Sequence, residues 1–136
     1  MAITADDVRE IFKGLENGDG APFFEHVAED VDWTVMGTHP LAGHYLGKNA
    51  FLEGTFAKLT QVLLRGAQLQ TEHVMVKDDE AVVELHSLAT AKNGMRFDNR
   101  YCRIMSSEQE TIVRVRAYLE FLLRRSHSCR RNFQMN

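Results

Sequence analysis

The dipeptide Asn93-Gly94 constrains this 136-residue chain more than any other feature, because it separates two long segments of alternating apolar and polar residues. Asn-Gly is a strong signal for a two-residue β-hairpin, since both residues of such a turn need a positive φ. The flanking segments, 81–92 and 95–105, are therefore predicted to be adjacent antiparallel strands. Any fold of this chain must accommodate an antiparallel sheet.

A two-residue turn would also determine which side chains meet across the hairpin. With this turn at the tip, His86 is expected opposite Tyr101. Glu84 is expected opposite Arg103, and because side chains alternate along a strand, Asn99 should share their face. A few convergent polar groups among apolar neighbours are typical of a pocket floor. The alternative is a solvated Glu–Arg salt bridge beside a histidine and a tyrosine that merely pack.

The remaining pattern predicts helices first and then a meander of strands, which is typical of an α+β fold. Thr4 resembles an N-cap, and Pro22 opens a second, shorter helix. A third helix is expected from about Lys48 to Leu64 after a loop from Gly37 to Gly47. Further strands are expected at 31–35, 67–76 and 111–123, with a polar loop at 106–110.

Composition excludes several classes of function. The chain is 44% hydrophobic, which is enough for a core, and no apolar run is long enough for a membrane span. Residues 1–120 contain 19 acidic and 12 basic residues, a net charge of −7, whereas four arginines give the last 16 residues a charge of +4. We therefore expect neither nucleic acid nor membrane as a partner. Cys102 and Cys129 suggest no disulfide framework, and no signal peptide is evident, so a cytoplasmic location is expected.

Other candidate residues lie outside the hairpin. Trp33 and Val35 share strand parity and are expected to line the cavity. His39 and His44 flank a Pro-Gly turn, where they either contact a ligand or are solvated. The histidines follow no zinc-ligand spacing and the glycines form no phosphate loop, so no metal and no cofactor are expected.

The loop from Gly37-Thr38-His39-Pro40 to Gly47-Lys48 and the segments 97–101 and 115–120 resemble SnoaL-like, ketosteroid-isomerase-related proteins of the nuclear-transport-factor-2-like superfamily. The resemblance implies a cystatin-like cone, in which a curved mixed or antiparallel sheet wraps around the N-terminal helices. It implies a domain at 1–123 followed by a basic tail at 124–136. It also implies a homodimer formed through the outer face of the sheet.

Ketosteroid isomerase uses a carboxylate base together with a tyrosine and a protonated aspartic acid. The resemblance places Val35 at the position of the base, Ile11 at that of the tyrosine and Arg103 at that of the aspartic acid, so that mechanism is not expected here. What remains is proton transfer next to a carbonyl of a small apolar substrate. His86 would move the proton, and Tyr101 and Arg103 would hold the oxyanion. The alternative is a domain that only binds a small ligand or only dimerises.

Overall fold

The computed structural model describes residues 3–17, 20–66 and 68–119. A six-stranded sheet runs in the order β2-β1-β8-β7-β4-β3, with β1 and β8 parallel and all other neighbours antiparallel. Its strands are β1 (Val27–Val35), β2 (Gly43–Leu46), β3 (Leu69–Lys77), β4 (Glu80–Ser87), β7 (Arg100–Glu108) and β8 (Thr111–Leu119). The short pair β5 (Ala89–Thr90) and β6 (Arg96–Phe97) extends the β4–β7 hairpin toward its tip.

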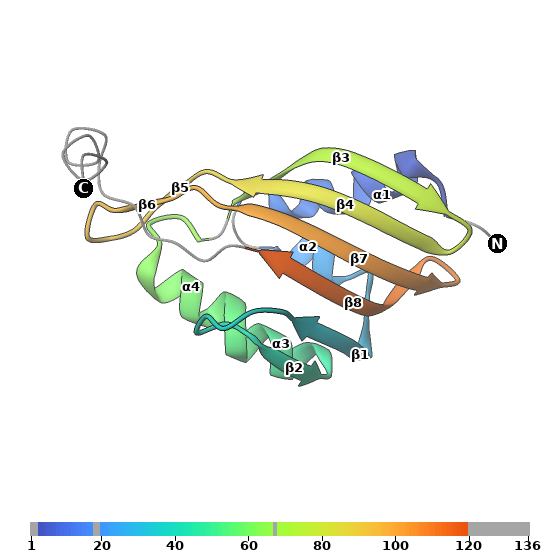
Figure 1. The fold of residues 1–136 in the computed structure, drawn as a ribbon, viewed down its shortest axis with the longest axis horizontal. Coiled ribbons are helices and arrows are strands. Elements are labelled where there is room, and N and C mark those ends of the chain that lie inside the picture. Colours follow the sequence, from blue (N-terminus) through green and yellow to red (C-terminus); the bar gives the residue numbers. More distant parts are fainter. Residues whose placement is uncertain (1–2, 18–19, 67, 120–136) are drawn as a thin grey trace.

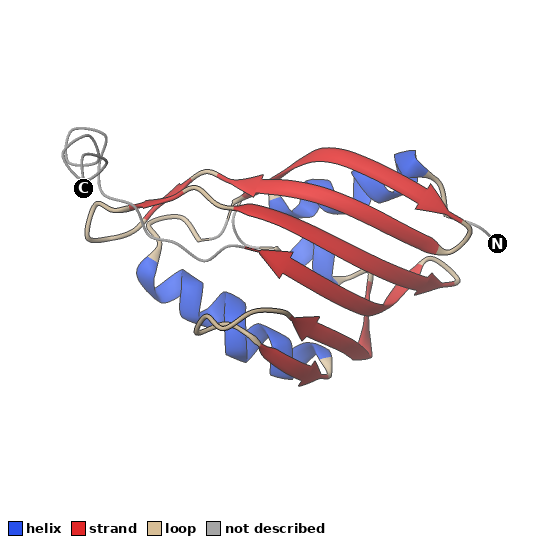
Figure 2. Ribbon diagram, in the orientation of Figure 1, coloured by secondary structure: helices blue, strands red, loops and turns tan. Residues whose placement is uncertain are grey.

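The helices cover one face of the curved sheet, as Figures 1 and 2 show. They are α1 (Ala5–Phe12), η1 (Lys13–Leu15), α2 (Ala21–Phe24), α3 (Lys48–Phe51), η2 (Leu52–Phe56) and α4 (Ala57–Val62). The first three contact one another, and α1 and η1 also contact β3, whereas α3 packs on β1 and β2. The predicted α+β fold with a curved, mostly antiparallel sheet is confirmed.

Local sequence accounts for the start of the first helix. The Thr4 hydroxyl accepts a hydrogen bond from the backbone amide of Asp7, and the Asp7 carboxylate accepts one from the amide of Thr4, both at 3.1 Å. This reciprocal capping satisfies two amides that the helix leaves without partners. The apolar side then buries Val8, Ile11 and Phe12 against the sheet.

The long third helix contains a π-helical segment, η2, between its two α-helical parts. The Thr55 hydroxyl donates a hydrogen bond to the carbonyl oxygen of Phe51 at 2.7 Å. Phe51, Thr55 and Phe56 are buried toward the sheet. At Gly54 a Cβ atom would lie 2.3 Å from the Tyr45 ring, so β2 can pack closely on this helix only because the residue is glycine.

Two predicted loops are partly strand. The segment from Gly37 to Gly47 includes β2, an edge strand that pairs with β1 although none of its side chains is buried. The segment 106–110 continues β7 to Glu108 and turns at Gln109 and Glu110, both with positive φ. Backbone pairing with a neighbouring strand makes both segments strands, and in β2 it does so without a buried side chain.

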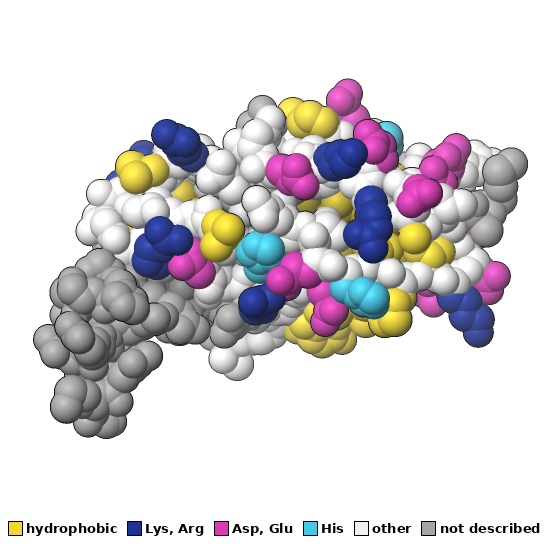
Figure 3. Space-filling model, turned by 90° about the horizontal axis from the view of Figure 1, so that it is seen from above, with side chains coloured by type: hydrophobic (Ala, Val, Ile, Leu, Met, Phe, Trp, Pro, Cys, Tyr) yellow, Lys and Arg dark blue, Asp and Glu magenta, His cyan; other side chains and the backbone are white. Residues whose placement is uncertain are grey.

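Surface charge is mixed on the side that lies uppermost in Figure 1. Figure 3 shows acidic and basic side chains interspersed there with small hydrophobic groups. Within residues 3–17, 20–66 and 68–119, no helix has both the length and the apolar character needed to cross a membrane. Glu120 and the basic segment at 124–136 lie outside the described residues.

Candidate functional site

The hairpin that forms the centre of the sheet is paired differently from the prediction. Each residue of β7 faces the β4 residue one position earlier than expected, so that Arg103 faces Val83 and Tyr101 faces Leu85. Side chains alternate between the two faces of a sheet along each strand. A shift of one residue in the pairing therefore places residues that were expected to face each other on opposite faces. Tyr101 and Arg103 therefore share the inner, helix-covered face with apolar neighbours.

The turn explains this shift. The amide of Gly94 donates to the carbonyl of Ala91 at 2.9 Å, and the amide of Ala91 donates to the carbonyl of Met95 at 2.7 Å. Three residues thus lie in the loop, and only Gly94 has a positive φ, +88°. This is the three-residue hairpin loop in which a turn is followed by a left-handed residue. The Asn-Gly signal located the hairpin correctly, but the loop is one residue longer than the two-residue form.

The predicted pairs His86–Tyr101 and Glu84–Arg103 are consequently wrong. Glu84 pairs with Cys102 and is exposed, and His86 pairs with Arg100. Both belong to the outer face of the sheet, whereas Tyr101 and Arg103 belong to the inner face. The polar cluster expected on one face is divided between two.

His86 belongs instead to a charged group on the outer face. Its Nδ1 lies 3.3 Å from Oε2 of Glu72, and Arg100 donates a hydrogen bond to Oε1 of the same carboxylate. That guanidinium, with a smaller contribution from His86, lowers the pKa of Glu72. The arrangement explains why these residues are polar, since each charge has a neighbour of opposite sign.

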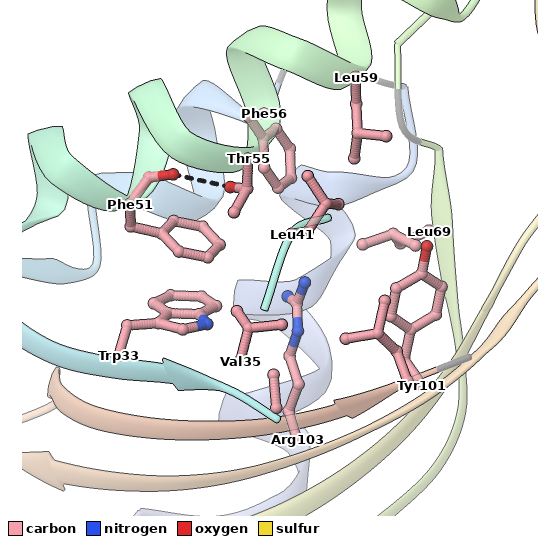
Figure 4. Close-up of a pocket in the computed structure, with 12 residues that line it drawn as sticks. Trp33, Val35, Leu41, Phe51, Thr55, Phe56, Leu59, Leu69, Tyr101 and Arg103 are labelled. Atoms are coloured by element: carbon pink, nitrogen blue, oxygen red, sulfur yellow. Dashed lines mark hydrogen bonds between the residues drawn. The ribbon is translucent and has the colours of Figure 1, made fainter. Parts of the chain in front are cut away.

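A pocket lies on the inner face between the sheet and the third helix (Figure 4). The space between its walls amounts to about 410 Å³, part of it open to solvent, and about 30 Å³ can hold the centre of a water molecule. Side chains from four strands, the third helix and one loop line it: Trp33, Val35, Leu41, Phe51, Thr55, Phe56, Leu59, Leu69, Tyr101, Arg103, Ala117 and Leu119. Trp33 and Val35 are both among these lining residues.

Arg103 is the unusual member of this wall. Its side chain is 4% exposed, and its strand neighbours are Val83 and the small Ala117. The guanidinium carbon lies 5.2 Å from the centre of the Trp33 ring and 6.0 Å from that of Tyr101. Burial lowers the pKa of Arg103 to about 10, and the group therefore stays charged at neutral pH.

The guanidinium lacks a counter-ion among the described residues. Neither Nε nor Nη1 of Arg103 has a hydrogen-bond partner there, and no described carboxylate forms an ion pair with it. The indole Nε1 of Trp33 is likewise buried without a partner in this part of the chain. Leaving buried donors unpaired is costly, so such groups point to a bound acceptor.

Trp33 is held in place by aromatic packing. Its ring stacks on Phe51 with centroids 3.8 Å apart, and Phe24 contacts both rings from α2. The edge carrying Nε1 is turned toward the side of the pocket where Arg103 stands (Figure 4). The rigid stack therefore presents one N–H group near the guanidinium.

The other predicted ligand-binding residues lie away from this wall. Asn99 is 1% exposed and its amide atoms have no partner among the described residues, yet it does not line the pocket. Nε2 of His39 lies 3.1 Å from the carbonyl oxygen of Met36, and its Nδ1 accepts from the amide of Leu41. His44 contacts Asp32 at 2.7 Å on the exposed edge of the sheet. Both histidines therefore order the loop and edge strand.

Sequence reasoning missed Thr55 and Leu41 as pocket residues. Thr55 lies four residues after Phe51 and four before Leu59, so helical spacing alone could have identified it. Leu41 carries no such signal, because it lies in a loop whose path depends on the rest of the fold. Among the described residues, no group of three or more His, Cys, Asp or Glu side chains could hold a metal ion.

This chain is similar in sequence to a curated protein. A curated fungal protein, dimerizing cyclase phiC of Fungal sp. (strain ATCC 74256), is 27% identical over 117 residues, which is 83% of this chain. The match covers 51% of that protein, so this chain spans about half the length of the curated relative.

Solved structures share the fold at low sequence identity. A nuclear-transport-factor-2-like protein from Burkholderia thailandensis superposes with a TM-score of 0.72 at 18% identity, covering 85% of this chain and 88% of the other. A protein with a cystatin-like fold from Xanthomonas campestris gives 0.69 at 22% identity, covering 84% and 88%. The model of the SnoaL-like domain family matches residues 8–115. This chain therefore belongs to the SnoaL-like family, within the nuclear-transport-factor-2-like fold.

Proposed function

We propose that this protein binds a small, mainly apolar molecule in the inner pocket and promotes an isomerase- or cyclase-type reaction next to a carbonyl group. The buried guanidinium of Arg103, without a described counter-ion in an apolar wall, is the observation that supports the proposal. A fixed positive charge in a site shielded from water stabilises an oxyanion more strongly than the same charge in water. The relative named as a cyclase supports the same class of reaction.

The proposal assigns the proton differently from the sequence-based hypothesis. His86 stands on the outer face, where Glu72 is its neighbour, so we leave it out of the mechanism. Among the described pocket residues, Tyr101 and Thr55 carry hydroxyl groups, and we assign removal of the proton next to the carbonyl to a water or hydroxide ion that enters through the open side of the pocket. We assign Tyr101 to the carbonyl oxygen because its ring lies 6.0 Å from the guanidinium of Arg103, which would stabilise the oxyanion.

Deuterium exchange tests this assignment. We expect the wild-type protein to accelerate exchange of the protons next to the carbonyl of 2-tetralone, a small apolar ketone, as followed by NMR. Tyr101→Phe and Arg103→Met should each slow the exchange at least about ten-fold, the usual size of a lost acid–base or oxyanion contact. His86→Ala should exchange the ketone at the wild-type rate, and a large loss in this variant would contradict the proposal.

A non-catalytic binding domain is the second candidate. It is favoured by one observation: no carboxylate and no imidazole is among the described residues of the pocket wall. Trp33 is the only tryptophan of the chain and lies in that wall, so its fluorescence reports occupancy. A protein that binds 2-tetralone, as seen by Trp33 fluorescence, yet leaves its exchange rate unchanged would favour this second candidate.

We also propose a homodimer formed through the outer face of the sheet. Met75, Leu88 and Tyr118 are between 44% and 55% exposed, which leaves apolar surface for a second copy to cover. Tyr118→Asp should then shift the protein toward the monomer in light scattering after size exclusion. Leu46→Asp, on the edge strand β2, is the matched control and should leave the mass unchanged.

A further inference from the structure

The pocket contains three N–H donors that share two properties. Nε and Nη1 of Arg103 and Nε1 of Trp33 are all buried, and none has a hydrogen-bond partner among the described residues. They come from two strands, β7 and β1, that are separated in the sheet by β8 alone. Figure 4 shows the guanidinium reaching into the space beside the indole edge.

A neutral carbonyl compound would satisfy this arrangement poorly. A single carbonyl oxygen accepts hydrogen bonds but leaves the positive charge of Arg103 uncompensated in an apolar wall. A carboxylate has two oxygens, can accept from several donors at once, and also cancels the charge. Charge-assisted hydrogen bonds of this kind are about twice as strong as neutral ones.

The dimensions of the pocket fit the same kind of group. About 30 Å³ of it can hold the centre of a water molecule, within a space of about 410 Å³ that is partly open to solvent. A carboxylate group has three heavy atoms. The neighbouring walls of Leu59, Leu69 and Leu119 offer apolar contact to whatever body the carboxylate carries.

We infer that the ligand of the inner pocket is an organic carboxylate with an apolar body, bound as the anion by Arg103 and the Trp33 indole N–H. This inference rests on the proposed function, since it concerns the molecule that enters the same pocket. A guanidinium has five N–H donors, so Arg103 can bind the carboxylate with some of them and still offer others to the oxyanion of the proposed reaction.

Two pairs of probes of nearly equal shape test the inference. Acetate is compared with acetamide, and benzoate with benzamide, each titrated at constant ionic strength while Trp33 fluorescence is recorded. We expect benzoate to bind at least about ten-fold more tightly than benzamide, as a charge-assisted contact implies. Arg103→Met should remove this preference. Arg100→Met, on the same strand but on the outer face, is the matched control and should keep it.

Each outcome separates the inference from the proposed function. If benzoate and benzamide bind equally, the pocket accepts apolar molecules and only the preference for an anion is wrong. If acetate binds and its binding depends on Arg103, but neither aromatic probe binds, the anion site is supported and the prediction of an apolar body on the ligand is wrong. If no probe binds, or if anion binding persists in Arg103→Met, the inference is overturned.

Discussion

At the scale of single residues, Arg103 is the group whose position requires an explanation beyond folding. An unpaired charge inside an apolar wall is among the least favourable features that a core can contain. The faces of Trp33 and Tyr101 offset part of this cost, because aromatic rings attract cations. Residues that lower stability in this way are common at functional sites.

Removing this charge should stabilise the protein. Arg103→Met keeps a long apolar side chain and avoids burying an uncompensated cation, so we expect the free energy of unfolding to rise by about 1–3 kcal/mol. Urea denaturation at pH 7 measures the change. Arg100→Met, which loses the contact with Glu72 on the outer face, should not raise stability. A decrease in Arg103→Met would show that the guanidinium stabilises the folded chain.

The ion pairs of Glu72 predict how the free energy of unfolding depends on pH. Arg100 holds the pKa of the Glu72 carboxyl below its usual 4.5 in the folded protein. The folded state therefore binds this proton less readily than the unfolded state. The ion pairs of Glu72 therefore make their full contribution to stability above the ordinary pKa of this carboxyl. The contribution is lost as the pH falls through its lower pKa in the folded protein.

We expect Glu72→Gln to lack this part of the acid dependence in urea denaturation curves recorded from about pH 5 downwards. Glu84→Gln is the control, because Glu84 stands on the same face and forms no ion pair among the described residues. Equal acid dependence in wild type and Glu72→Gln would refute the assignment.

At the scale of elements, the length of the hairpin loop decides which residues of β4 and β7 lie on the same face of the sheet. Gly94 has a φ of +88°, and a Cβ atom there would meet nothing within 4 Å. The cost of a side chain at this position is thus purely conformational.

Gly94→Ala should lower the free energy of unfolding by about 1 kcal/mol, because L-residues disfavour the left-handed region. The control Lys92→Ala changes a neighbouring loop residue whose φ is negative, and it should have little effect. Denaturant titration of both variants checks this. Equal stability of the two variants would argue against the three-residue loop.

The third helix contributes to the site through its irregular middle. The π-helical segment η2 adds residues within one turn, so that Phe51, Thr55 and Phe56 all reach the same wall. Such segments are frequent at functional sites because they reorient side chains without ending a helix. The pocket therefore depends on a local distortion that hydrophobic periodicity does not reveal.

At the scale of the whole molecule, this chain shares the family fold, and the sequence predicts Ile11, Val35 and Arg103 at the positions of the ketosteroid isomerase residues. Val35 and Arg103 line the pocket, and Ile11 is buried outside its wall. None of these side chains is a carboxylic acid or a phenol. The fold supplies a shaped cavity, while the chemistry depends on the residues placed in it.

We therefore expect no measurable conversion of a 5-ene-3-ketosteroid to its conjugated isomer, followed by the ultraviolet absorbance of the product. An authentic ketosteroid isomerase in the same cuvette provides the positive control. Rapid conversion by this protein would mean that other residues replace the missing base and oxyanion hole.

The sequence by itself determined the class of fold, the capped first helix, the long third helix and the existence of the central hairpin. These follow from side-chain periodicity, caps and turn residues, which act over a few neighbouring positions. It also identified Trp33, Val35, Tyr101 and Arg103 as residues of interest.

Only the tertiary structure decided which of those residues meet. One extra residue in the hairpin loop placed His86 and Glu84 on the outer face and left Arg103 with apolar neighbours. The loop length depends on backbone hydrogen bonds of Ala91 with Gly94 and Met95, and the same Asn-Gly dipeptide is compatible with either length. Because side chains alternate with a period of two, that single residue moves His86 to the outer face and leaves Tyr101 and Arg103 together on the inner one.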